Sequence, residues 1–180
     1  MKRHLAMISI CCSIPLCYAT NAAPFGQELG VAKCQDSIRD LSSRVNFESA
    51  GVNKYTKGPM YSGKAEGLGL EGAKSILLIC DKNNTLSAIQ LVIDKGAFSS
   101  AFDKYIKMLK SKYKQVYLIN PSVGTKASKY SQGGSSILLF APHMSFDMSL
   151  IYATNQFMKS FDKVTKQEDL NKEKFQQNSL

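Results

Sequence analysis

The sequence predicts an α+β protein in which helices pack on one face of an antiparallel sheet. Apolar residues recur at helical spacing in two segments, around 31–44 and 97–113. Each segment is followed by apolar, β-branched runs of strand length. The first two runs are joined by a short polar turn, as in a β-hairpin. Helices and strands segregated along the chain in this way are typical of the α+β class.

Residues 1–22 are typical of a secretory signal peptide. Lys2 and Arg3 precede an apolar run from Leu5 to Ala19, and small residues follow it. The run is shorter than the roughly 20 apolar residues that a membrane-spanning helix needs. No later segment of the sequence is apolar enough to span a bilayer. We therefore expect cleavage after Ala22 and a periplasmic or secreted mature chain.

Removing this leader leaves a basic chain with two cysteines. The leader holds three of the five cysteines and two of the 23 Lys and Arg residues, so 21 basic and 14 acidic residues remain, a formal net charge of +7. In an oxidising compartment Cys34 and Cys80 are predicted to form one disulfide. The alternatives are two free buried thiols or a redox pair, and the lack of a Cys-x-x-Cys motif counts against the latter.

The first half of the domain is predicted as a helix over 31–44 and strands over 74–81 and 86–94. The helix carries an apolar stripe at i, i+3, i+7, i+10 and i+14, formed by Val31, Cys34, Ile38, Leu41 and Val45. On the first strand, alternation places Ile76, Leu78 and Cys80 on one face. A helix packed on that face brings Cys34 close to Cys80.

The second half repeats this order. A helix over 97–113 is indicated by the apolar positions Phe102, Tyr105, Ile106, Leu109 and Tyr113. Strands are predicted over 115–120, 136–141 and 146–152, and a Gly/Ser/Lys-rich connection separates the first two. The sequence Ser-Ile-Leu-Leu occurs at 75–78 and again at 136–139.

Two interpretations of this recurrence are open. Residues 23–165 form a single domain built from two helix-plus-β-hairpin repeats, 25–95 and 96–153, or the shared tetrapeptide arises by chance. A third helix is predicted over 155–165. Residues 166–180 form a polar tail, either a frayed helix end or a disordered segment.

The opening Phe25-Gly26-Gln27-Glu28-Leu29-Gly30, running into a helix and a hairpin, resembles that of many small exported bacterial proteins. Over 25–153 the tandem pattern is similar in outline to the β-lactamase inhibitory protein family and to the small assembly lipoprotein of the outer-membrane β-barrel machine. This resemblance implies a protein that binds other proteins and catalyses nothing. It transfers no binding residue to this chain.

The remaining motifs predict a chain that binds no nucleotide and no cofactor. Residues 58–65 match a P-loop except at Ala65, where a Ser or Thr must reach magnesium, so we expect a loop and no nucleotide. His143 is the only histidine of the mature chain. An alternative function is therefore a small hydrolase or a copper-handling protein centred on His143, with Met144 and Met148 as soft ligands. Core packing is the commoner role for Met148, which alternates with apolar neighbours.

A basic helix face and a tyrosine-containing segment are the candidate contact surfaces. The second helix carries a group of lysines away from its apolar stripe: Lys104, Lys107, Lys110 and Lys114. They form either a solvated face or a surface that attracts an acidic protein, anionic lipid or cell-wall polymer. RNA or DNA is not expected as a partner, because the chain is predicted to be exported and contains no nucleic-acid-reading motif. A binding loop is predicted at Tyr55, Lys57, Met60, Tyr61 and Lys64, the alternative being that both tyrosines fold back onto the sheet.

Together these patterns predict an exported, non-enzymatic protein-binding module, such as an inhibitor, an immunity-type protein or an envelope accessory protein. Its expected partner is another envelope or secreted protein, and the net charge makes an acidic one the first candidate.

Overall fold

The computed structural model describes residues 21–96 and 100–178, so the predicted leader lies outside the described residues except for Asn21 and Ala22. The helices are α1 (Cys34–Leu41), α2 (Ala101–Lys110) and α3 (Asn155–Asn178), with two short 3-10 turns, Pro24–Gly26 and Glu66–Leu68. The strands are β1 (Glu48–Val52), β2 (Lys57–Lys64), β3 (Ala73–Asp81), β4 (Leu86–Asp94), β5 (Lys114–Ile119), β6 (Lys126–Gln132), β7 (Ser135–Ala141) and β8 (Asp147–Thr154).

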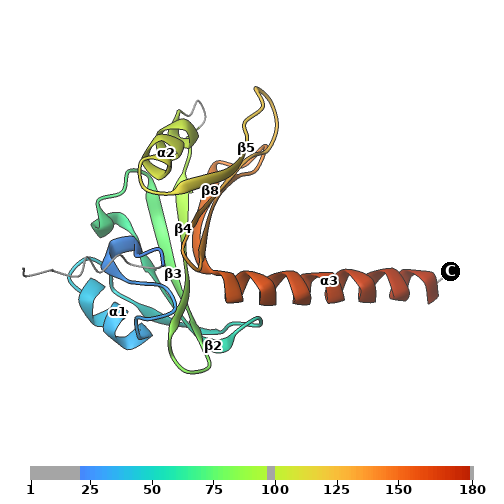
Figure 1. Ribbon diagram of the computed structural model, residues 1–180, viewed down its shortest axis with the longest axis horizontal. Helices are drawn as coiled ribbons and strands as arrows, with labels where there is room; N and C mark the ends of the chain where they lie inside the picture. The colour runs from blue at the N-terminus through green and yellow to red at the C-terminus, as the bar shows by residue number, and fades with distance from the viewer. Residues whose placement is uncertain (1–20, 97–99, 179–180) are drawn as a thin grey trace, which may run out of the picture.

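The eight strands form one antiparallel sheet in the order β1-β2-β3-β4-β8-β7-β6-β5 (Figure 1). The prediction of an α+β protein with an antiparallel sheet is confirmed. Helix α1 precedes the four strands β1 to β4, and α2 precedes the four strands β5 to β8. Strands β4 and β8 meet at the centre, paired from Ala88↔Ala153 to Asp94↔Asp147.

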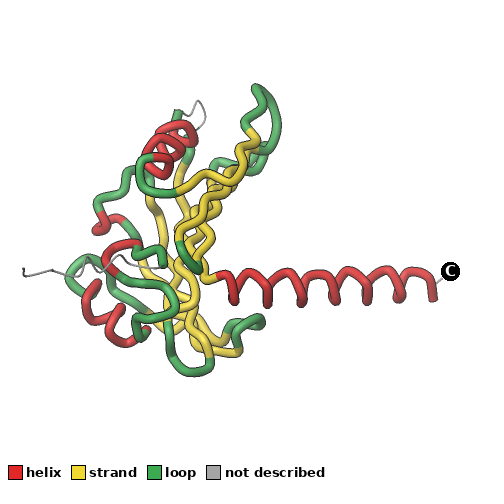
Figure 2. Tube along the Cα trace, in the orientation of Figure 1, coloured by secondary structure: helices red, strands yellow, loops and turns green. Residues whose placement is uncertain are grey.

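The two faces of the sheet carry separate buried clusters. One cluster joins α1 and α2 to the sheet, for example through Leu41, Leu109 and Leu91. The second contains Phe157 of α3 with Ile79 of β3, and Ile79 alternates along its strand with Leu78 and Cys80 of the first cluster. Figure 2 shows α1 and α2 on one side of the strands and α3 running away from the other. The prediction that the helices cover one face therefore does not describe α3.

Three strands of the sheet were not predicted from the sequence. Strand β1 was not predicted, β2 occupies the segment predicted as a binding loop, and β6 lies in the predicted Gly/Ser/Lys-rich connection. In β2, a Cβ atom at Gly58 would lie 2.3 Å from the carbonyl oxygens of both Cys80 and Asp81. Glycine thus lets β2 approach β3 closely at a register shift between Lys57 and Met60.

The helices differ from prediction mainly in length. Helix α1 is shorter than the predicted 31–44, and α2 begins at Ala101, whereas 97–99 lie outside the described residues. Helix α3 continues to Asn178 and so includes most of the segment predicted as a polar tail. Among the described residues, no helix is both long and apolar enough to cross a membrane.

Candidate binding surface

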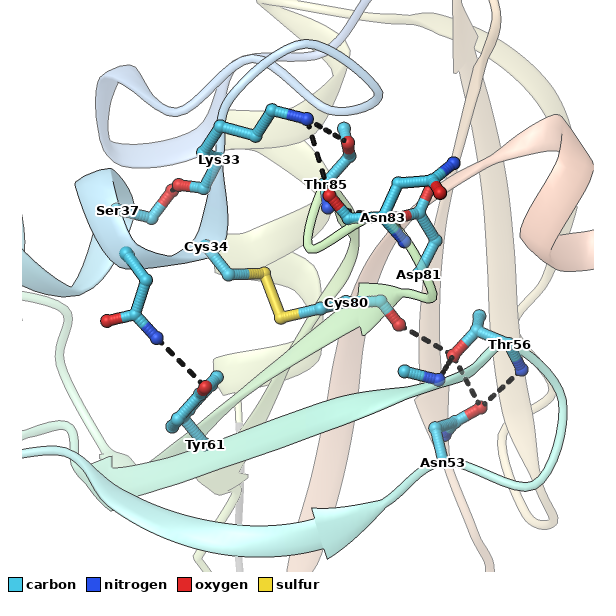
Figure 3. Close-up of a disulfide and its surroundings, with 12 residues drawn as sticks. Lys33, Cys34, Ser37, Asn53, Thr56, Tyr61, Cys80, Asp81, Asn83 and Thr85 are labelled. Carbon is cyan, nitrogen blue, oxygen red and sulfur yellow. Dashed lines mark hydrogen bonds between the residues drawn. A yellow bond between two sulfur atoms is a disulfide. The ribbon is translucent and has the colours of Figure 1, made fainter.

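The predicted disulfide is confirmed, and it ties α1 to β3 (Figure 3). Cys34 and Cys80 are both fully buried. The backbone N–H of Cys34 donates to the Asn84 carbonyl at 2.9 Å, so the start of α1 is also fixed to the β3–β4 turn. Beside it, the Lys33 ammonium donates to the Asn83 carbonyl and the Thr85 hydroxyl. The cystine therefore holds a helix onto the sheet.

The five residues predicted as a binding loop are divided between the two faces of the sheet. Tyr61 of β2 faces α1, where its hydroxyl accepts a hydrogen bond from Gln35 Nε2 at 2.9 Å. Met60 packs against the cluster on the opposite face. Lys57 and Lys64 are exposed at the two ends of β2.

Tyr55 lies in the β1–β2 turn and packs against α3. Its ring centroid is 6.0 Å from that of Phe157 and 4.9 Å from that of Phe161. The turn is held by the Asn53 carboxamide, whose Oδ1 accepts from the backbone N–H of Tyr55. The same oxygen accepts from the backbone N–H of Thr56 (Figure 3). Half-buried Tyr55 thus supports the first turns of α3, as the fold-back alternative predicts for this tyrosine.

Salt bridging extends this contact along α3. Lys54 Nζ lies 2.9 Å from the Glu168 carboxylate, which raises the pKa of Lys54. Both side chains are about half exposed, so the pair adds little to stability. It does show that α3 and the β1–β2 turn run side by side over three helical turns.

The face of the sheet opposite α1 and α2 is called here the open face. Strand register places two rows of side chains across it, because Cα partners in an antiparallel pair point to the same side. The first row crosses all eight strands and consists of Glu48, Ser62, Leu77, Gln90, Ile151, Leu138, Lys129 and Tyr117. The second row consists of Lys64, Ser75, Val92, Ser149, Phe140, Ala127 and Ile119.

Large apolar side chains in these rows are accessible to solvent. Phe140 is 45% exposed, Tyr117 41% and Ile119 54%, while Leu138 and Ile151 are half-buried. Phe157 and Tyr55 pack at a third row of the same face, formed by Met60, Ile79, Ala88 and Ala153. Helix α3 therefore stands at one end of a partly apolar surface.

A cluster of charged residues lies at the other end of the central strand pair. Asp94 and Asp147 are directly opposite each other in the register of β4 and β8. Lys74 lies between them, 3.2 Å from the Asp94 carboxylate and 2.7 Å from that of Asp147, and both carboxylates raise the pKa of Lys74. The backbone N–H of Gly96, followed by Lys74, lowers the pKa of Asp94.

The three residues of the copper alternative are not gathered on one surface. His143 and Met144 lie exposed in the β7–β8 turn, with Met144 90% exposed. Met148 is 1% exposed and belongs to the core shared with α1 and α2. Within the part of the chain that the structure describes, no group of three or more His, Cys, Asp or Glu side chains could hold a metal ion.

The lysines predicted on the second helix do not form a uniform free face. Lys104 pairs with Glu71, whereas Lys107 and Lys110 point to solvent. Lys114 belongs to β5, where it shares the open face with Ser131. Burial raises the pKa of Tyr105, whose hydroxyl donates to the Glu71 carbonyl at 2.9 Å beneath this helix.

The sequence prediction missed the open face as a candidate site. A signal for it was present in the unbroken apolar runs Ile76–Ile79 and Ile137–Phe140, since a run without alternation puts apolar side chains on both faces of a strand. In an antiparallel sheet with helices on one side, the second face of such strands is left to solvent or to a partner.

Comparisons with known proteins leave the family open, since no protein-family model, no curated protein and no solved structure matches the chain. The resemblance to the β-lactamase inhibitory protein family and to the assembly lipoprotein stays a prediction.

Proposed function

We propose that the chain is an exported, non-enzymatic protein-binding module that contacts its partner through the open face. The observation that carries this proposal is the accessible set of apolar side chains in the open-face rows, above all Phe140, Tyr117 and Ile119. Contiguous apolar groups on a protein surface mark interaction sites, because covering them removes apolar area from water. An inhibitor, an immunity-type protein or an envelope accessory protein would each use such a surface.

The proposed surface keeps two of the five residues predicted to bind. Lys64 lies in the second open-face row, and Met60 lies in the row beside α3. Tyr55 has a supporting role, because it packs against Phe157 and Phe161 at the border of the surface. Tyr61 faces α1 and contributes to the fold instead.

An internal duplication is part of the proposal, and strand register supports it. The two Ser-Ile-Leu-Leu segments occupy β3 and β7, which are each the third strand after a helix. Leu77 and Leu138 fall in the same open-face row, on opposite sides of the central pair Gln90↔Ile151. A two-fold axis through that pair would exchange β3 with β7, as a duplication requires.

Charge and redox chemistry support an exported protein with an acidic partner. The mature net charge of +7 attracts acidic surfaces and speeds encounter with them. The Cys34–Cys80 disulfide supports an oxidising compartment, such as the periplasm or the cell exterior.

The test compares affinity capture from envelope and culture fractions of the producing cells. Phe140→Glu places a charge on the open face, and Val31→Glu is its matched control, because Val31 is 60% exposed near the start of α1. Wild-type protein and the control should retain the same partner, and Phe140→Glu should lose it. A melting curve under oxidising conditions shows that each variant is folded. Retention of the partner by folded Phe140→Glu would sink the open-face proposal.

A further inference from the structure

Strand β5 is an edge of the sheet whose outer side is open. In the described residues, β6 is the only strand paired with β5. An edge strand presents backbone N–H and C=O groups along its outer side, and another extended chain can pair with them. Tyr117, Leu118 and Ile119 are in regular register with β6, so this end of the edge has the geometry that an added strand requires.

The last four side chains of β5 are apolar and exposed, and they include side chains on both faces of the sheet. Val116 is 56% exposed and Leu118 38%, values similar to those of Tyr117 and Ile119. Tyr117 and Ile119 point to the open face, whereas Leu118, paired with the buried Ser128, points to the face of α2. A strand beside β5 would cover apolar surface on both sides at once.

The opposite edge is built differently. Strand β1 has Val52 as its one large apolar side chain, and it contains Gly51 at a φ of +85°. Its pairing with β2 shifts register between Ser49 and Val52. Strand β5 also shifts register, between Gln115 and Tyr117, but it contains no glycine and keeps three consecutive pairs from Tyr117 to Ile119. Glycine in a strand discourages strand addition, so the two edges of this sheet are unequal.

The surroundings of β5 are predominantly basic, and the nearby acidic group is Asp103, whose carboxylate accepts a hydrogen bond from Asn120 Nδ2 just beyond the strand. The chain has no Asp or Glu between Asp103 and Asp147, a segment that covers most of α2 and all of β5, β6 and β7. This segment contains seven lysines: Lys104, Lys107, Lys110, Lys112, Lys114, Lys126 and Lys129. Lys129 is paired with Tyr117 on the open face. Lys114 is paired with Ser131, which lies two residues beyond Lys129 on β6 and on the same face.

This charge distribution decides between two occupants of the edge. A second copy paired through β5 would bring two lysine-rich surfaces together, and the excess of like charges would oppose the contact. A partner segment carrying Asp or Glu would instead place carboxylates next to Lys114 and Lys129.

We propose that β5 is a docking edge for an extended, acidic, proline-free segment of a partner protein, which joins the sheet beside β5 as an additional strand. The inference rests on the proposed protein-binding function and names the chemistry and geometry of one contact. Backbone pairing along β5 supplies affinity, and alternate apolar and acidic side chains supply selectivity.

The experiment screens a random octapeptide library against the oxidised mature chain and maps the selected peptide by NMR. Enriched peptides should lack proline, and they should alternate Asp or Glu with β-branched or aromatic residues. Their binding should slow amide exchange in β5 and should weaken as salt is raised. Leu118→Glu should weaken binding roughly tenfold or more. Val52→Glu, at the β1 edge, is the matched control and should leave binding unchanged.

Three outcomes would overturn the inference. Binding that is lost in Phe140→Glu but kept in folded Leu118→Glu would assign the peptide to the open face, which leaves the proposed function intact. A doubled mass in light scattering, with β5 amides protected in the protein alone, would identify a second copy as the occupant. A library that yields no binder, or binders without acidic residues, would also contradict an acidic strand at β5.

Discussion

Ala22 is fully buried, and its backbone N–H donates to the Ser135 hydroxyl at 3.1 Å. Its neighbour Asn21 bridges two parts of the fold, since its side chain accepts from the Gly134 N–H at 2.8 Å and donates to the Leu29 carbonyl at 2.9 Å. The cleavage predicted after Ala22 would remove all three hydrogen bonds. These contacts favour a cleavage site closer to the N-terminus.

We therefore expect the exported chain to begin at Thr20. Cleavage after Ala19 places small residues, Cys17 and Ala19, at the third and first positions before the scissile bond, as signal peptidases prefer. Intact-mass measurement of the exported protein checks this expectation. A chain that begins at Ala23 would contradict it and would show that the contacts of Asn21 and Ala22 are dispensable.

Lys74 neutralises two carboxylates that the sheet register places opposite each other, and this predicts a pH-dependent effect of Lys74→Met. The pKa of Asp94 is lowered in the fold, so its stabilising contribution is present above the ordinary value of 3.8 and is lost as the pH falls through the lower folded value. The raised pKa of Lys74 means that its contribution is lost only at alkaline pH, above 10.5.

Lys74→Met should therefore destabilise the protein more at neutral pH than at an acidic pH below the lowered pKa of Asp94, where that carboxylate is protonated. Urea denaturation at both pH values measures the difference. Lys82→Met, at an exposed position of the β3–β4 turn, is the control and should change neither midpoint. An equal loss of stability at both pH values would mean that Lys74 acts through packing rather than charge.

At the scale of elements, the disulfide is the link that holds the short helix α1 on the sheet. It closes a separation of 46 residues, for which chain entropy predicts about 4 kcal/mol of stabilisation. Replacing Cys34 and Cys80 together by alanine should lower the free energy of unfolding by about that amount. Urea denaturation of the double variant measures it, with reduced wild-type protein as the control that keeps both sulfur atoms. Equal midpoints for all three forms would show that the disulfide leaves stability unaffected.

Elements with a strong period were predictable, and elements without one were not. The stripe ending at Leu41 and Val45 located α1, and apolar runs located β3, β4, β5, β7 and β8. Strand β6 reads Lys-Ala-Ser-Lys-Tyr-Ser-Gln, yet Ser128 and Tyr130 are fully buried, because neighbouring strands and α2 enclose it. Strand β2 contains glycine and proline that suggest a loop, and only its neighbours in the sheet make it a strand.

The same limit applies to the candidate site. The pairing of Cys34 with Cys80 followed from alternation on one strand and a helical stripe, both of which are local patterns. The open face instead depends on the register of eight strands, which brings Tyr117 into the row of Leu138. Register is a long-range property, so local periodicity could not identify that surface.

At the scale of the whole molecule, both halves of the chain contribute to one core. A single buried cluster contains Leu41 of α1, Leu91 of β4, Leu109 of α2 and Leu150 of β8. The halves meet along β4 and β8, where Leu91 is paired with Leu150 and Ile89 with Tyr152. Separating them would expose this seam to water, and it would leave each half with two sheet edges.

The two halves should therefore fold only together, as one cooperative domain, and a chain cut between them tests this. Fragments 21–96 and 97–180 each contain a helix followed by four strands, and the second also contains α3. The disulfide lies wholly within the first. Neither should give the dispersed NMR spectrum of a folded protein alone, because a fragment of about 80 residues buries too little apolar surface to offset an exposed seam. An equimolar mixture should recover the spectrum of the intact chain. A first fragment that is folded by itself, with its disulfide oxidised, would instead identify the two halves as independent domains.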